Sequence, residues 1–278
     1  MRVGYAARGI VYVMVGALAF LAALSGARAP DSKTALGALL EMPLGEALLG
    51  AVAAGLIAYS LWCFIDGALD LDDKGNEAKG WAARSAKIIS GAVHLGFALS
   101  VAPLALGDNS EGGGDSAEHW TAVLLQQPFG RWLVAIVGVI ALAFGVQHFV
   151  KAYKEKYKDN LRYTSTAERL APVLKIGLAA HGMVALLVGG FFLWAAWTAE
   201  PSRAGGLRDA LEAVRSAESG QILLAIVALG LIAFAVYCFI EATFRIVPRC
   251  APPGLETLGS RARELMSDPA SALIRSRR

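Results

Sequence analysis

Charged side chains are scarce in this sequence, and several long stretches contain none. Only 18 % of the 278 residues are Asp, Glu, Lys or Arg, whereas 56 % are hydrophobic. Charged residues make up about 25 % of an average soluble protein, whose surface they keep hydrated. The composition therefore excludes an ordinary water-soluble protein.

Cysteine and histidine are also rare, and the short motifs that mark common enzyme sites are absent. The three cysteines, Cys63, Cys238 and Cys250, are an odd number at positions that imply no disulfide framework. The sequence contains no Walker loop, dinucleotide fingerprint, nucleophile elbow or HExxH motif. We therefore expect a protein that is not an enzyme, with no catalytic residue and no cofactor.

The apolar residues are gathered in six runs. These cover residues 9–25, 44–65, 88–107, 132–150, 176–199 and 219–240. Each run is close to the roughly 20 residues with which a helix crosses the hydrocarbon core of a membrane. Their Gly and Ala content suits close helix packing in lipid. The sequence predicts an all-α polytopic membrane protein with six transmembrane helices.

The six runs are three copies of one two-helix unit. The sequence GIVYVMVG at residues 9–16 returns as GMVALLVG at 182–189 and, more loosely, as GAVHLGFA at 91–98. The second helices align through Gly45, Gly130 and Gly220. Arg2 and Arg8 before the first run are typical of a signal peptide, but a cleaved segment has no reason to match internal helices. We therefore expect the first run to stay in the protein.

We place the three repeats at residues 2–75, 81–160 and 170–248, followed by a basic cytoplasmic tail at 249–278. An amphipathic stretch precedes each second helix, as in Leu207, Ala210, Leu211 and Val214, and we expect it at the membrane interface. Each repeat holds two spanning helices, so every copy enters and leaves on the same side. This predicts three parallel helical hairpins with pseudo-threefold symmetry.

Short motifs recur within the repeats. They are Ala7-Arg8-Gly9 before the first helix, Pro43-Leu44-Gly45 and Pro128-Phe129-Gly130 before the second, and Glu241-Ala242 with Arg245 at the end. In their order and threefold recurrence they resemble the family called domain of unknown function 1206, over about residues 2–247. The third repeat departs from the pattern, with Glu218-Ser219-Gly220 at the turn and His181 in place of the arginine. The resemblance implies a bacterial cytoplasmic-membrane protein and supplies no activity.

Polar residues recur at matching depths of the second helices. One level is Cys63, His148 and Cys238, and the next, three residues on, is Asp66, Lys151 and Glu241. The charged level either reaches the lipid headgroups from the helix ends or forms a buried network that joins the repeats. The first level can hold zinc or copper if the three helix faces converge, and otherwise packs within the helix core.

The first helices carry their own polar residues within the membrane, Arg8, His94 and His181. A membrane histidine can bind haem or a metal or relay protons, although hydrogen-bonded packing is commoner. These three residues are candidate polar sites within the membrane.

Two functional classes fit the pattern. The first is a non-catalytic structural or accessory membrane component whose basic face meets anionic lipid headgroups or a protein partner, and not nucleic acid. The alternative is an ion or small-solute permease or channel with polar residues between the repeats. A continuous polar path favours the second class and a Gly/Ala-packed centre favours the first. The small number of polar residues in each helix leads us to expect the first.

The orientation follows from the basic residues and can be tested. Of the 26 Lys and Arg residues, 20 lie at the N-terminus, in the connections 66–87 and 151–175, and in the tail from Arg245. The positive-inside rule therefore predicts that both termini are cytoplasmic. In a variant without native cysteines, a cysteine at Lys158 should react with an impermeant reagent only after cells are opened, whereas a control at Ser110 should react in intact cells. Exclusive outside labelling of position 158 would overturn this topology.

Overall fold

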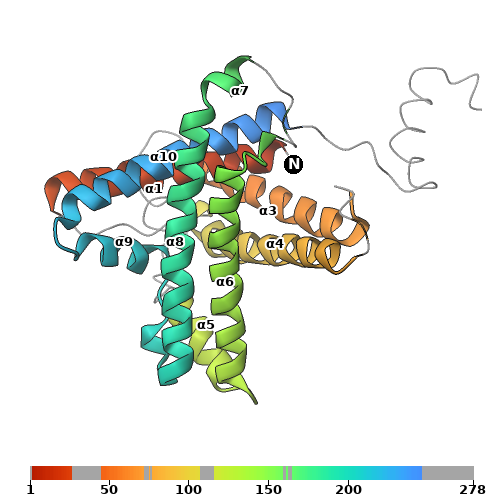
Figure 1. The fold of residues 1–278 in the computed structure, drawn as a ribbon. Coiled ribbons are helices and arrows are strands. Elements are labelled where there is room, and N and C mark those ends of the chain that lie inside the picture. The colour runs from red at the N-terminus through yellow and green to blue at the C-terminus, as the bar shows by residue number, and fades with distance from the viewer. Residues whose placement is uncertain are drawn as a thin grey trace, which may run out of the picture. The chain divides into compact units, whose positions relative to one another are not determined.

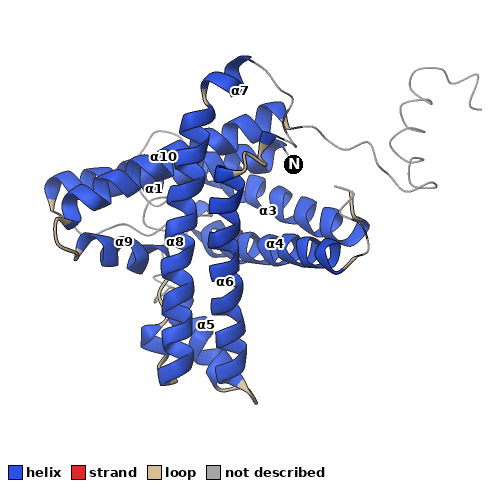
Figure 2. Cartoon of the chain, in the orientation of Figure 1, coloured by secondary structure: helices blue, strands red, loops and turns tan. Residues whose placement is uncertain are grey.

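A computed structural model describes residues 2–26, 45–71, 75, 77–106, 116–158, 161 and 165–245. Nearly all of this part of the chain is helical, and it contains no β-strand (Figure 2). The elements are α1 (Arg2–Ser25), α3 (Gly45–Leu69), α4 (Ala78–Ala105), α5 (Ser116–Leu125), α6 (Gly130–Tyr153), α7 (Ser165–Arg169), α8 (Ala171–Thr198), η3 (Pro201–Arg203), α9 (Leu207–Arg215) and α10 (Gly220–Phe244). The expected tail at 249–278 and Cys250 lie outside the described residues.

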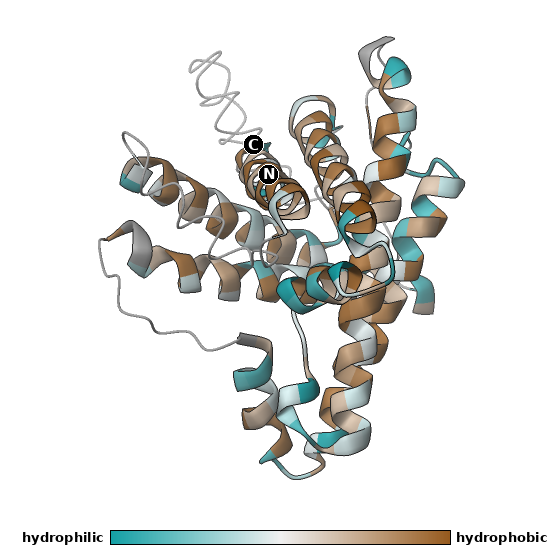
Figure 3. Ribbon diagram, turned by 90° about the vertical axis from the view of Figure 1, so that its left-hand side faces the viewer, coloured by the Kyte–Doolittle hydropathy of each residue, from teal (hydrophilic) through white to brown (hydrophobic). Residues whose placement is uncertain are grey.

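Six helices are long and apolar enough to cross a membrane, namely α1, α3, α4, α6, α8 and α10. They coincide with the six apolar runs, so the all-α architecture with six membrane-spanning helices is confirmed. Figure 3 shows hydrophobic residues along the long helices and hydrophilic residues mainly at their ends and on the short helices. On α6, Trp132, Ile136 and Val139 are all more than half exposed, as side chains facing lipid are.

The chain divides into two compact units. The first comprises Met1–Ser60 and Val93–Ile246, and the described part of the second is Leu61–Ala92. The boundaries fall inside α3 and α4, so the units do not follow the three repeats.

Within the first unit, four long helices are successive neighbours. α1 lies along α10, α6 lies along α8, and α8 crosses α10 (Figure 1). α1 is the first helix of the first repeat and α10 is the second helix of the third repeat. Likewise, α8 is the first helix of the third repeat and α6 is the second helix of the second repeat. The most extensive contacts among these four helices therefore join different repeats.

Glycines bring these helices close at positions that the repeats share. A Cβ on Gly9 would lie 2.7 Å from the Phe239 ring, and a Cβ on Gly182 would lie 3.1 Å from the Phe149 ring. Two turns further on in each pair, Gly16 faces Ile232 and Gly189 faces Leu142. In both cases the partner residues are aligned positions of α10 and α6. The contact of α1 with α10 thus recurs in the contact of α8 with α6.

The two helices of a hairpin also meet through shared positions. A Cβ on Gly4 would lie 2.7 Å from the Cα of Tyr59, and one on Gly177 would lie 2.4 Å from the backbone N of Phe234. Gly55 faces Ala7 and Gly230 faces Ala180 in the same way. The first and third hairpins therefore share their crossing contact. Pseudo-threefold symmetry of all three hairpins stays a prediction, which these matched contacts favour.

The turns into the second helices of the second and third repeats share a specific backbone requirement. Phe129 and Ser219 both adopt the left-handed conformation, with φ of 62° and 61°. A Cβ on the following residue would collide with a carbonyl oxygen, 2.3 Å away at Gly130 and 1.7 Å away at Gly220. Ser219 therefore makes the same turn without the proline, and the departure of the third repeat preserves its geometry.

Helix α9 contains the amphipathic stretch expected at the membrane interface. Its residues Ala210 and Leu211 are fully buried, because α9 packs against α8 and α10. Leu207 and Val214 are partly buried against the same core. The apolar face of α9 is thus covered by the protein's own helices.

Two glycines of α8 provide a matched test of the packing. Gly177 meets backbone atoms of α10, whereas a Cβ on the exposed Gly190 would meet nothing within 4 Å. We expect Gly177→Ala to destabilise the protein by about 1–3 kcal/mol, as overpacking does, and Gly190→Ala to have no such cost. The thermal unfolding midpoint of each variant is measured in detergent, with size-exclusion chromatography used to monitor the loss of folded protein. Equal midpoints for the two variants would contradict this crossing of α8 and α10.

Candidate functional site

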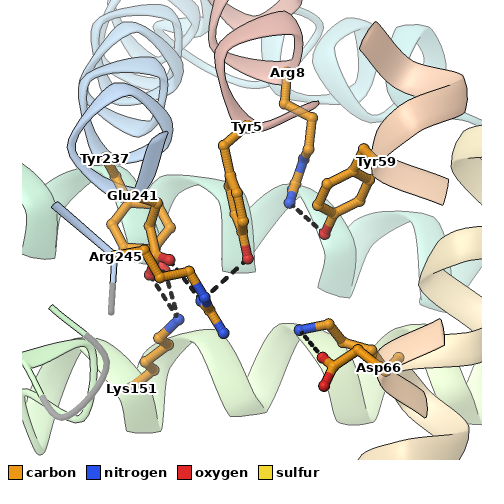
Figure 4. Close-up of polar contacts among 9 residues, drawn as sticks. Tyr5, Arg8, Tyr59, Asp66, Lys151, Tyr237, Glu241 and Arg245 are labelled. Carbon is orange, nitrogen blue, oxygen red and sulfur yellow. Dashed lines mark hydrogen bonds and ion pairs between the residues drawn. The ribbon is translucent and has the colours of Figure 1, made fainter. Parts of the chain in front are cut away.

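A network of charged and phenolic side chains joins α1, α6 and α10 at one end of the helices (Figure 4). Glu241 on α10 is completely buried. It accepts a hydrogen bond from the Tyr237 hydroxyl at 2.5 Å and one from the Arg245 guanidinium at 2.6 Å. The Lys151 ammonium of α6 lies 3.8 Å from the same carboxylate and donates to the Tyr237 hydroxyl at 2.5 Å. Arg245 also donates to the Tyr5 hydroxyl of α1 at 3.1 Å.

Because Glu241 is buried, its carboxylate needs charged or hydrogen-bonding partners within the protein. A buried carboxylate without partners costs several kcal/mol, because the surroundings do not solvate it as water does. Glu241 has two cations and one hydroxyl around it, from α6 and from the end of its own helix. Lys151 is the partner that joins α6 to α10.

A second cluster lies around Arg8, where a cation meets aromatic rings. Arg8 is only 7 % exposed, and it donates a hydrogen bond to the Tyr59 hydroxyl at 2.9 Å. Its guanidinium carbon lies 5.0 Å from the centroid of the Tyr59 ring and 5.7 Å from that of Phe234. Cation–π contacts of this kind stabilise a guanidinium by about 2 kcal/mol or more when water is excluded. They do not neutralise its charge.

His181 occupies the position of α8 that aligns with Arg8. Its Nε2 lies 2.8 Å from the Tyr12 hydroxyl, and its ring stacks on Phe234 with centroids 4.0 Å apart. The ring of His148, from α6, is 4.8 Å away, and its Nδ1 pairs with the Phe144 carbonyl at 2.9 Å. Two histidines and a tyrosine from three helices thus meet within the membrane-spanning part of the first unit.

The second unit contains a separate ion pair. The Asp66 carboxylate, 3 % exposed, lies 2.8 Å from the Lys87 ammonium. Nearby, Arg84 donates to the Gly67 and Ala68 carbonyls at the end of α3, at 2.8 and 2.7 Å. These contacts join α3 to α4, the second helix of the first repeat to the first helix of the second. They provide one more interaction between different repeats.

Outside the membrane spans, Glu155 links the connection after α6 to the start of α8. Its carboxylate pairs with the ammonium groups of Lys158 and Lys175. Hydrogen bonds from these two lysines lower the pKa of Glu155 to about 2. The carboxylate is therefore ionised throughout the physiological pH range.

The structure brings together some of the residues singled out in the sequence. Lys151 and Glu241 interact directly, whereas Asp66 pairs with Lys87 inside the second unit. Arg8 and His181 both contact the Phe234 ring, and His94 contacts the Tyr59 ring with centroids 4.8 Å apart. The candidate site is therefore built around the aromatic rings of Phe234 and Tyr59.

The metal hypothesis finds no support in the described geometry. Cys63 and Cys238 are fully buried, and Cys63 belongs to the second unit whereas Cys238 and His148 belong to the first. Within the described residues, no group of three or more His, Cys, Asp or Glu side chains could hold a metal ion.

Sequence reasoning missed the tyrosines of the site. Tyr237 and Arg245 flank Glu241 at spacings of four residues, which places all three on one helix face. That spacing was the available signal for the network. Tyr5 and Tyr59 carried no such signal, because their partners come from helices distant in the sequence.

The three repeats also match a known protein family. Residues 3–70, 87–155 and 176–245 each match the family described as Domain of Unknown Function (DUF1206). The chain belongs to the DUF1206 family. The three matches confirm the tandem repeat and the resemblance drawn from the motifs.

A bacterial relative spans almost the whole DUF1206 chain. It is a protein of Bacillus subtilis (strain 168) named "Uncharacterized protein YxxB", 30 % identical over 248 residues, which are 88 % of this chain and 90 % of the relative. No solved structure matches the DUF1206 chain.

Neutralising Glu241 tests the importance of its buried network. We expect Glu241→Gln to destabilise the protein by about 3–5 kcal/mol, because it leaves two cations without their carboxylate. The matched control is Glu200→Gln, which breaks an exposed pair with Arg203 and should cost at most about 1 kcal/mol. Thermal unfolding midpoints of both variants give the comparison. Similar losses would show that the buried network contributes no more than a surface pair.

Proposed function

We propose that this protein is a non-catalytic structural or accessory component of the bacterial cytoplasmic membrane. The proposal rests on one observation above others. Most of the polar side chains that are buried in the described part of the first unit interact across helices, as Arg8 does with Tyr59 and Arg245 with Tyr5. Groups used in this way fix the positions of helices and are not available to a substrate.

The packing supports the same proposal. The described crossings of α1 with α3 and of α8 with α10 bring backbone atoms together at Gly4 and Gly177. Such contacts favour rigid association of helices in lipid, where small residues allow close approach. A rigid bundle suits a protein that supports or positions a partner.

The membrane orientation and the lipid partner belong to this proposal. The partition of Lys and Arg favours cytoplasmic termini, and each basic residue near an anionic surface contributes about 1 kcal/mol. On the opposite side we place Trp132 and Trp197, which are 72 % and 82 % exposed at the start of α6 and the end of α8. Tryptophans at helix ends are typical of the membrane interface.

A permease for a small solute is the second candidate function. It is favoured by one observation, the meeting of Arg8, Tyr12 and His181 within the membrane-spanning part of the fold. Buried ionisable residues of this kind often mark ion pathways.

Flux measurements separate the two candidates. Purified protein is reconstituted into vesicles that contain dyes sensitive to anions, cations or protons. We expect leak rates equal to those of empty vesicles. A solute flux that is lost in Arg8→Gln and retained in Arg84→Gln would replace the proposed role with the permease.

The accessory role also makes a positive prediction. A tagged chain extracted gently from its native membranes should retain a stoichiometric protein partner. The control is purified chain added to the extract after solubilisation, which should not acquire that partner. Recovery of the chain alone from cross-linked native membranes would contradict an accessory role.

A further inference from the structure

Arg8 carries a buried positive charge that no described carboxylate balances. Arg8 donates a hydrogen bond to a neutral phenol, Tyr59, and its Nε is buried without a hydrogen-bond partner in the described part of the chain. Burial is the main influence on this charge, and its ionisable neighbours Tyr59, Cys238, Tyr12 and Tyr5 include no carboxylate. An arginine in a low-dielectric environment cannot avoid this cost by losing its proton.

The two carboxylates that are buried in the described part of the chain, Asp66 and Glu241, have other partners. Glu241 binds Arg245 and lies beside Lys151, which already gives two cations for one carboxylate. Asp66 pairs with Lys87 in the second unit. Within the described part of the first unit, the cation at Arg8 is thus in excess.

His181 provides a second unused polar atom close to the same rings. Its Nδ1 is buried with no hydrogen-bond partner among the described residues, while its Nε2 interacts with the Tyr12 hydroxyl. Tyr12 also interacts with the Arg8 guanidinium, so its hydroxyl connects the two side chains. Arg8 and His181 contact the same Phe234 ring. A guanidinium N–H and an imidazole N–H are both donors to anions.

We propose that Arg8, Tyr12 and His181 form a binding site for one small monovalent inorganic anion of the halide class. The charge of the anion matches the single guanidinium, whereas a divalent anion would need a second unbalanced cation. The surrounding rings of Tyr59 and Phe234 exclude water and favour a weakly hydrated ion. The site requires binding only, so it is compatible with a static membrane component and does not depend on the proposed function.

Chloride is the probe for this site. Purified full-length protein in neutral detergent is titrated with chloride against gluconate at constant ionic strength. We expect radioactive chloride to bind saturably, about one ion per chain, and the thermal midpoint to rise with the same concentration dependence. Bromide and nitrate should compete, and gluconate should not. Absence of saturable chloride binding to the parent protein would overturn the proposal whatever the variants do.

Variants assign the binding to these residues. Arg8→Gln should weaken chloride binding by about tenfold or more, since it removes the charged donor. His181→Phe keeps the stacked ring and should weaken binding by a smaller factor. The control Arg84→Gln removes a guanidinium that donates to the Gly67 and Ala68 carbonyls and should bind like the parent. Unchanged affinity in both Arg8→Gln and His181→Phe would show that chloride binds elsewhere and would refute the site.

Discussion

The pairing of the buried Glu241 carboxylate is the constraint on which the packing of α1, α6 and α10 depends. Glu241 is completely buried, and its carboxylate is held by Arg245 and Tyr237 and faces Lys151. Since these groups come from α6 and α10, and Arg245 extends the network to Tyr5 of α1, one carboxylate fixes the ends of three helices. The apolar faces of the helices could pack in several registers, but only registers that complete this network avoid the cost of an unpaired charge.

The repeats share their backbone contacts and differ in their polar chemistry. Gly4 and Gly177 approach aligned residues of their hairpin partners, so the crossing of the helices is the same in the first and third repeats. At the aligned positions Arg8 and His181, however, one repeat has a permanent charge and the other an imidazole. Packing at a glycine depends on the backbone, so the side chains at the nearby positions Arg8 and His181 can differ without changing the helix crossing.

The sequence predicts the spans of this protein better than the neighbours of each helix. Hydrophobic length is a local property, so all six spans and the threefold repeat could be found from composition and motif spacing. The repeat alignment also placed Lys151 and Glu241 at one depth, and they interact. It could not predict that α1 lies along α10, because helix periodicity identifies a buried face but not the helix that covers it. Tyr5 was missed for the same reason.

The divergence at the aligned positions has an electrostatic reason. The motif before the first helix has arginine at Arg8, whereas the aligned positions of the other repeats hold Ser90 and His181. Arginine at position 181 as well as at Arg8 would place two permanent charges around the same Phe234 ring. The second charge would add a desolvation cost of several kcal/mol and repel the first. One guanidinium and one imidazole keep hydrogen-bond donors around the Phe234 ring while limiting the permanent charge there to one. Exact repetition of Arg8 at position 181 would therefore be less stable than the histidine that the sequence contains there.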